Sequence, residues 1–339
     1  MSEHDEAFRD RIATVNEKGK RIWIFPKKPS GSFYNKRKLV SYLMLGFLFA
    51  GPHIRIKGEP LLMLNIIERK FEMAAAFAMA MLIIAGEIDL SVASIIALAS
   101  TIMGLAMSMG APVPVLVLLG IGTGLAAGAF NGLLVTRFNL PSIVVTIGTM
   151  SLFRGISYII LGDGAYTGYP AGLAWFGQGY VWWVFSVELV LFALMAVVFY
   201  ILLHRTNFGR AVFAIGNNAT AARFSGIRVD RVRFTLFLLT GGMSGLAAVC
   251  LTSRLGSTRP SIATGWELEV VTMVVLGGVS ILGGSGSIPG VVIAALVMGL
   301  VTFGLGLLNV PGIVMSIILG VLLIAVIALP RLWARARRA

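Results

Sequence analysis

The feature that most constrains this chain is a succession of long apolar segments running from residue 39 almost to the C-terminus. The sequence of 339 residues is 57% hydrophobic and only 13% charged, whereas a soluble domain has about 25% charged residues. Several segments reach the roughly 20 residues that a helix needs to cross a bilayer. Because lipid cannot satisfy backbone polar groups, spanning segments must be helices or closed barrels, and these segments lack the alternation of barrel strands. The sequence therefore predicts an all-α, polytopic transmembrane helical bundle.

About ten apolar segments are predicted to cross or enter the membrane. They are 39–54, 73–86, 90–109, 112–136, 141–162, 179–203, 232–252, 268–284, 288–309 and 311–330. An even number places both termini on one side. Lys and Arg residues gather before residue 39, in the loop 204–233 and after residue 330. Cytoplasmic segments are rich in these residues, so both termini and this loop are predicted to be cytoplasmic.

The region before residue 90 fits this topology less well. Segment 39–54 is short, and the following residues 55–72 carry several basic side chains on the predicted outer side. Segment 73–86 is also short, and a re-entrant segment is an alternative to a full crossing. The expected organisation is a basic arm at 1–38, an atypical membrane segment with a charged linker at 39–71, a transmembrane domain at 72–330 and a basic tail at 331–339.

Composition also excludes several function classes. The net charge of +13 does not indicate nucleic-acid binding, because the basic residues flank apolar segments as the positive-inside rule requires. Cys250 is the single cysteine, so neither an intrachain disulfide nor a cysteine-based metal site is expected. The chain lacks the G-x-x-x-x-G-K-[ST] loop that holds nucleotide phosphates, and the glycine-rich stretch 283–290 is predicted to be a tight turn. No catalytic residue, metal site or cofactor is predicted in this chain.

Two carboxylates lie inside the apolar stretch GEIDLSVASIIALAS at 86–100. Carboxylates at membrane depth are costly and are commonly functional. Gly86, Glu87, Asp89 and Ser91 are predicted to form a helix break, with Asp89 capping the helix that starts near Leu90. Alternatives are a cation or proton site at Glu87 and Asp89, or direct contact with a transported molecule.

The loop 204–233 is predicted to contain a short helix. Asn217 or Asn218 can cap a helix over 219–225, and Gly226 can end it. A short helix between two spans can lie in a groove of a partner protein. The alternative is an ordinary basic loop.

Polar residues within the spans are candidates for a transport pathway. Asn131, Arg154 and Glu188 are the predicted members. Arg154 and Glu188 could pair across helices, or each could extend to the membrane interface. Glu267 and Glu269 begin a segment from the outer side and could face a partner or line an entrance.

From about residue 72 onward the chain resembles the inner-membrane permeases of bacterial ABC importers for monosaccharides. The resemblance rests on four stretches in order: GEIDLSVASIIALAS at 86–100, NGLLVTRFNLPSIVVTIGTMSLFRG at 131–155, RTNFGRAVFAIGNNATAARFSGI at 205–227 and RPSIATGWELEVVTMVVLGGVSILGGSGSIPG at 259–290. The class handles ribose, xylose, arabinose, rhamnose and autoinducer sugars. The sequence GEIDLS, where many members have GGIDLS, leans towards rhamnose-type permeases.

The resemblance implies partners and a mechanism. It implies a second permease subunit, identical or different, an ATP-binding subunit that carries ATP and Mg²⁺, and a periplasmic sugar-binding protein. The 204–233 loop would dock on the ATP-binding subunit. The positions that match the family in this loop are Gly209, Arg210, Ala214, Gly216, Asn217, Ala221, Ala222 and Gly226.

Residues 21–71 instead resemble the N-terminus of the cytochrome c oxidase accessory proteins, which are membrane iron–sulfur proteins. Such clusters need several cysteines, and this chain has one, so that chemistry is not expected. The junction near Phe71 suggests a fusion. The leading interpretation is a permease subunit of the bacterial inner membrane rather than an enzyme. The alternatives are a secondary transporter driven by an ion gradient and an inactive fusion.

Overall fold

The computed structural model describes residues 13–15, 21–23, 74–181 and 185–336, and the chain divides into two units between Arg55 and Ile56. In the first unit, β1 (Ala13–Val15) pairs with β2 (Arg21–Trp23) in an antiparallel hairpin, with Thr14 opposite Ile22. The predicted first membrane segment and the charged linker that follows it lie outside the described residues.

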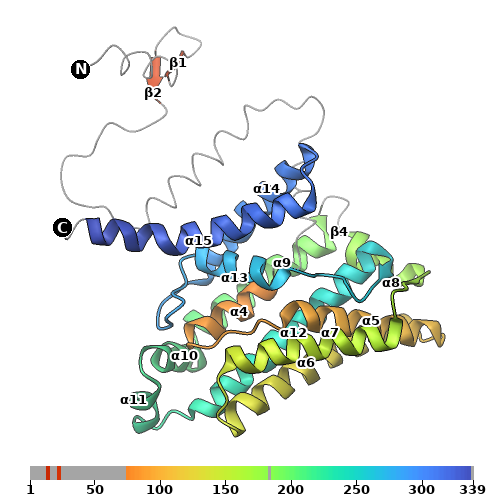
Figure 1. Ribbon diagram of the computed structural model, residues 1–339, viewed down its shortest axis with the longest axis horizontal. Helices are drawn as coiled ribbons and strands as arrows, with labels where there is room; N and C mark the ends of the chain where they lie inside the picture. Colours follow the sequence, from red (N-terminus) through yellow and green to blue (C-terminus); the bar gives the residue numbers. More distant parts are fainter. Residues whose placement is uncertain (1–12, 16–20, 24–73, 182–184, 337–339) are drawn as a thin grey trace. The chain divides into compact units, whose positions relative to one another are not determined.

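The described part of the second unit is almost entirely helical (Figure 1). Its long apolar helices are α5 (Val92–Ser108), α6 (Val113–Arg137), α7 (Ser142–Leu161), α9 (Val187–His204), α12 (Val229–Leu255), α14 (Ile288–Leu307) and α15 (Gly312–Ala336). Shorter helices are α4 (Ala75–Ile84), α8 (Ala171–Gln178), α10 (Asn207–Asn217), α11 (Ala219–Phe224) and α13 (Trp266–Leu276).

Each segment predicted from residue 73 onward contains a helix, which confirms the all-α, polytopic prediction. Five helices in the described residues have the length and composition of a full membrane span: 113–137, 142–161, 187–204, 229–255 and 288–306. Three predicted segments are less continuous than expected. In segment 179–203 the helix begins only at Val187. Segment 268–284 is helical only as far as Leu276, where Gly277 and Gly278 end α13, and α4 has only ten residues.

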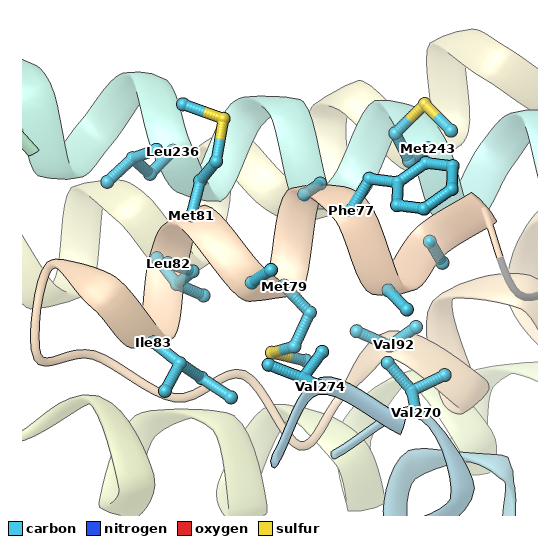
Figure 2. Close-up of a cluster of buried hydrophobic side chains, with 14 of the residues drawn as sticks. Phe77, Met79, Met81, Leu82, Ile83, Val92, Leu236, Met243, Val270 and Val274 are labelled. Carbon is cyan, nitrogen blue, oxygen red and sulfur yellow. The ribbon is translucent and has the colours of Figure 1, made fainter. Parts of the chain in front are cut away.

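Helix α4 lies at the centre of the fold. All ten of its residues are buried, and it packs against α12, α13, α10, α14 and α9. Figure 2 shows Phe77 and Met81 of α4 beside Met243 and Leu236 of α12, and Met79 on the side of Val270 and Val274 of α13. A helix that is apolar all round needs protein or lipid on every side, and ten residues rise only about 15 Å. Helix α4 is therefore a core element held by protein.

Helices α6 and α12 cross at a glycine contact. Gly124 and Gly128 of α6 lie directly against Gly241 and Gly245 of α12, so that the backbone of one helix touches the backbone of the other. Small residues allow this approach in lipid, where association depends on packing and hydrogen bonds between helices. Gly124 and Gly128 therefore serve helix packing, and Gly104 packs against Tyr166 and Thr258.

The connections of the second unit gather at two ends of the bundle. One end, called here the basic end, contains residues 84–91, 137–142, 204–233 and 277–288, and its contacts include His204 Nε2 accepting from the Ile288 amide. The other end holds α8 and two short antiparallel pairings: β3 (Tyr166–Thr167) with β6 (Ser257–Thr258), and β4 (Tyr180–Val181) with β5 (Phe185–Ser186). In Figure 1, α10 and α11 lie at the end opposite α8.

Candidate functional site

The predicted helix break is present between α4 and α5. Helix α4 ends at Ile84 and α5 starts at Val92. Gly86 turns the chain with a φ of 85°, which favours glycine. Residues 87–89 have no helical structure, although Glu87 and Asp89 are buried. The break therefore places two carboxylates and an open stretch of backbone inside the protein.

Asp89 lies two residues before the N-cap of α5, which is Ser91, and therefore is not itself the cap that was predicted. Its Oδ1 accepts hydrogen bonds from the Ser91 amide at 2.8 Å and from Ser91 Oγ at 2.6 Å. Helix α5 begins at Val92, one residue after Ser91, and the Ser91 carbonyl accepts from the Ile95 amide at 2.8 Å. A carboxylate just before the helix accepts from the N-cap amide and complements the positive end of the helix dipole.

Helices α6 and α7 hold the break in place. Asn131 Nδ2 of α6 donates to Ser91 Oγ at 2.8 Å. Ser142 Oγ of α7 accepts from the Ile88 amide at 3.3 Å, and Thr146 Oγ1 donates to the Ile88 carbonyl at 3.4 Å. Buried backbone groups outside a helix need such partners. Asn131, which the sequence offered as a pathway residue, is a structural partner of the break in this arrangement, and so is Thr146.

Glu87 has a basic partner that the sequence did not indicate. Arg233, in the first turns of α12, places Nε 2.9 Å from Glu87 Oε1. The Glu87 side chain is 9% exposed and that of Arg233 is 24% exposed. The two residues are far apart in sequence: Arg233 is the last residue of the basic loop, and Glu87 belongs to the helix break. The ion pair therefore connects the two predicted sites.

The 204–233 loop folds into two helices. Asn218 Oδ1 accepts from the Ala221 amide at 2.9 Å and caps α11, and Gly226 follows it with a φ of 84°. This confirms the prediction, with Asn218 rather than Asn217 as the cap. Helix α10 was not predicted. Thr206 caps it by accepting from the Gly209 amide at 3.2 Å. Apolar residues at 208, 212 and 215 give it a helical period, which is the signal that could have identified it.

The predicted positions of this loop separate into two groups. Gly209 and Ala222 are buried, and Gly216 and Ala214 are partly buried. The exposed members are Arg210, Asn217, Ala221 and Gly226. The outer surface of the α10–α11 segment also holds Phe224, whose side chain is 90% exposed. Sequence reasoning missed Phe224 because α11 is too short for its pattern to define a face.

The α10–α11 segment rests directly on α4. Gly216 lies against the Ile84 carbonyl, where a Cβ would overlap the oxygen. The Gly284 amide donates to the same carbonyl at 2.9 Å. Asn217 lies against Gly284. The glycine-rich turn 283–286 thus joins the last turn of α4 to the end of α10.

Arg154 and Glu188 do not pair with each other, contrary to one alternative from the sequence. Arg154 Nη1 donates to the Pro260 and Ile262 carbonyls at 2.6 and 2.7 Å. Glu188, in the first turn of α9, has Arg254 Nη1 of α12 at 3.5 Å from its Oε2. The predicted Arg154–Glu188 pairing was wrong because backbone carbonyls can also serve as partners of an arginine. The amino-acid sequence does not show which carbonyls will lie close to it. Both contacts lie away from the basic end.

The remaining polar candidates do not form a metal site. Glu267 and Glu269 lie in the first turn of α13. Across the described residues, no group of three or more His, Cys, Asp or Glu side chains is arranged to hold a metal ion.

Comparisons with known proteins agree with this architecture. Residues 73–327 match the family model described as branched-chain amino acid transport system / permease component. The chain is 36% identical over 276 residues to the ribose import permease protein RbsC of Bacillus subtilis strain 168, covering 80% of this chain and 85% of the relative. It is 36% identical over 258 residues to the autoinducer 2 import system permease protein LsrD of Yersinia enterocolitica, covering 74% and 78%. The corresponding LsrD of Salmonella typhimurium strain LT2 is 35% identical over 258 residues, covering 74% and 77%. No solved structure matches the chain.

Proposed function

Because the chain belongs to the family of branched-chain amino acid transport permease components, we propose that it is the membrane subunit of an ATP-driven importer for a monosaccharide. The proposal draws its substrate class from relatives named for ribose and autoinducer 2 import. Helices α6, α7, α9, α12 and α14 would supply membrane spans. The protein is then a transport permease and not an enzyme, and ATP hydrolysis belongs to a separate subunit.

The basic end is the cytoplasmic end in this proposal. Arg205, Arg210, Arg228 and Arg231 lie there on exposed or partly exposed surface, as the positive-inside rule favours. The protein would reside in the bacterial inner membrane. An even number of crossings, counted with segment 39–54, would place both termini in the cytoplasm.

The α10–α11 segment is the proposed docking site for an ATP-binding subunit. The observation that carries this proposal is Phe224, an aromatic side chain that is 90% exposed on a short helix among basic residues. Exposed aromatic residues with adjacent arginines are typical of the residues that dominate binding energy at interfaces. ATP and Mg²⁺ would bind in the partner. Closure of an ATPase dimer would move this segment, which rests on α4 through Gly216.

Two further partners are proposed. A second permease subunit, identical or different, would complete the pathway, and a periplasmic sugar-binding protein would dock at the end that holds α8. Within the sugar class, rhamnose is proposed from the GEIDLS sequence at 86–91, and ribose is the competing choice. An ion-gradient transporter is less well supported, because Glu87 is already neutralised by Arg233.

The N-terminal segment is proposed to be a fused element from an oxidase accessory protein. The family match begins at residue 73, which lies next to the junction inferred near Phe71. A fusion that prevents assembly is the competing outcome, and the following experiment separates the two.

The test is purification of the tagged full-length chain from its native membrane in mild detergent, with partners identified by mass spectrometry. Recovery of an ATP-binding subunit supports the importer. Recovery of oxidase subunits, or of no stable partner, contradicts it. Reconstituted complexes are then assayed for ATP-dependent uptake of labelled rhamnose, ribose, xylose and arabinose, and uptake without ATP would contradict the ATP-driven mechanism.

Two variants locate the docking surface. Phe224→Ala is expected to reduce recovery of the ATP-binding subunit at least about tenfold, because truncating a central aromatic residue commonly costs 2 kcal/mol or more. Phe138→Ala is the matched control, since Phe138 is an exposed aromatic residue at the same end but outside the α10–α11 segment. Equal recovery of the partner by both variants would contradict docking at Phe224.

A further inference from the structure

We propose that the ion pair between Glu87 and Arg233 transmits movement of the α10–α11 segment to the helix break at 85–91, so that both act as positioning residues in transport. The inference rests on the proposed function. It assigns a role in coupling to two residues whose partnership only the folded structure reveals.

The Glu87–Arg233 ion pair lies in a largely buried environment, where the interaction between two charges is strong. Glu87 is 9% exposed and Arg233 is 24% exposed, with 2.9 Å between Oε1 and Nε. Removing one partner of a buried pair leaves an uncompensated charge and is strongly unfavourable. A comparison lies nearby in the Arg223–Asp230 pair, whose side chains are 52% and 53% exposed at 2.6 Å. Exposed pairs contribute little, so of these two pairs at the basic end the Glu87 pair is the one that can carry force between elements.

The pair also lies between the two parts that must communicate. Arg233 is in the first turns of α12, the helix that follows α11 after a short connection. Glu87 is on the open backbone of the break. A displacement of α11 and the start of α12 would therefore act on the break through this contact.

A second contact reaches the break from its other side. Gly216 of α10 and the Gly284 amide both meet the Ile84 carbonyl at the end of α4. The α10–α11 segment and the start of α12 thus hold both ends of residues 84–87. Between them, Gly86 adopts a positive φ, and the Gly86 and Glu87 amides close a turn onto the Ile83 and Leu82 carbonyls instead of continuing the helix.

The break is in turn attached to the membrane helices. The Ile88 amide donates to Ser142 of α7, and Ser91 Oγ accepts from Asn131 of α6. A shift at Glu87 would reach α5, α6 and α7 together. In this proposal, the connection between α4 and α5 would be the two-state element that coupling between distant sites requires.

The experiment uses the full complex, purified with its ATP-binding subunit and reconstituted in liposomes. It compares ATP hydrolysis with uptake of the sugar that the wild type transports from the panel above. Glu87→Gln removes the negative charge with nearly the same shape, and Arg233→Gln removes the positive charge with a shorter polar side chain. Arg231→Gln is the matched control, because it removes the same charge from an exposed position in the same turn of α12. Glu87→Asp keeps the negative charge on a shorter side chain and tests whether the charge itself supports coupling.

The expected result is loss of coupling rather than loss of the complex. Glu87→Gln and Arg233→Gln should each lower sugar uptake per ATP hydrolysed about tenfold, within the range typical of coupling between sites, with recovery of the ATP-binding subunit retained. The double variant should be no worse than either single, since both remove one interaction. Arg231→Gln should match the wild type, and Glu87→Asp should retain more coupling than Glu87→Gln.

Two results would overturn the inference. One is an uptake-to-hydrolysis ratio for Glu87→Gln within twofold of the wild type. The other is a double variant whose loss equals the product of the single losses, which indicates independent effects. If Glu87→Gln reduces folded protein, the ratio is measured on the assembled fraction. Failure of the wild type to recover an ATP-binding subunit would instead contradict the proposed function itself.

Discussion

Replacing Gly124 by alanine should destabilise the bundle by forcing α6 away from α12. A Cβ at Gly124 would lie 2.7 Å from both Cα and N of Gly245 and would overlap the Gly241 carbonyl oxygen. All three neighbours are backbone atoms, so no side chain can rotate away. The two helices must separate, and the neighbouring contact of Gly128 with Gly241 is disturbed with them.

The magnitude follows from the cost of overpacking, which is about 1–3 kcal/mol for an inserted methyl group. Gly122→Ala provides the matched control, because Gly122 lies on the same helix with nothing within 4 Å of its Cβ position. Both variants gain the same helix propensity, about 1 kcal/mol. The difference between them therefore isolates overpacking. At about 2–4 °C per kcal/mol for a unit of this size, Gly124→Ala should unfold about 4–8 °C below Gly122→Ala for a cost of ~2 kcal/mol.

The assay is thermal unfolding of the purified chain in one detergent. Unfolding is measured as the decrease in the monodisperse fraction that remains after heating. The wild type and both variants are measured at the same protein concentration. Equal unfolding temperatures for Gly124→Ala and Gly122→Ala would refute the backbone contact between α6 and α12. A lower temperature for Gly122→Ala alone would show that the open face of α6 has been assigned wrongly.

Two further predictions concern the buried polar contacts. Asp89→Ala should lower stability by about 1–3 kcal/mol because the Ser91 amide and hydroxyl lose a buried acceptor. Asp89→Asn, which keeps one acceptor oxygen, should lose less. Equal unfolding temperatures for the wild type and Asp89→Ala would contradict a stabilising role of these two hydrogen bonds. Arg154→Gln should release the 259–265 connection, since two charged hydrogen bonds to Pro260 and Ile262 are lost. Hydrogen exchange of that connection should then be about tenfold or more faster, because hydrogen bonds to charged groups contribute about 1.5–3 kcal/mol each, and unchanged exchange would argue against this anchoring.

Local chemistry explains which parts of the site could be predicted from the sequence. Asn218 and Gly226 bound a helix of six residues, and both act within a few positions of their own place in the chain. Asp89 likewise bonds to a residue two positions away. Capping depends on short spacing and side-chain type, so the sequence contains the information. The apolar segments were equally predictable, because bilayer thickness sets their length.

Long-range pairing could not be predicted in the same way. Glu87 meets Arg233, while Glu188 meets Arg254 and Arg154 meets two backbone carbonyls. Each buried charge needs a partner, but several arginines satisfy that need equally well until packing brings one of them close. In the folded chain, the first turns of α12 meet Glu87 and its last turn meets Glu188.

The position of α4 explains why the break is a plausible point of control. A ten-residue helix cannot span the bilayer by itself, so its last carbonyls and the following residues must find partners within the protein. Ile84 finds one in Gly284, Ile88 in Ser142, and Glu87 in Arg233. These partners come from the turn after α13, from α7 and from α12, which are separate elements. Any movement of one relative to the others must be absorbed at residues 85–91, where the chain turns between the end of α4 and the start of α5.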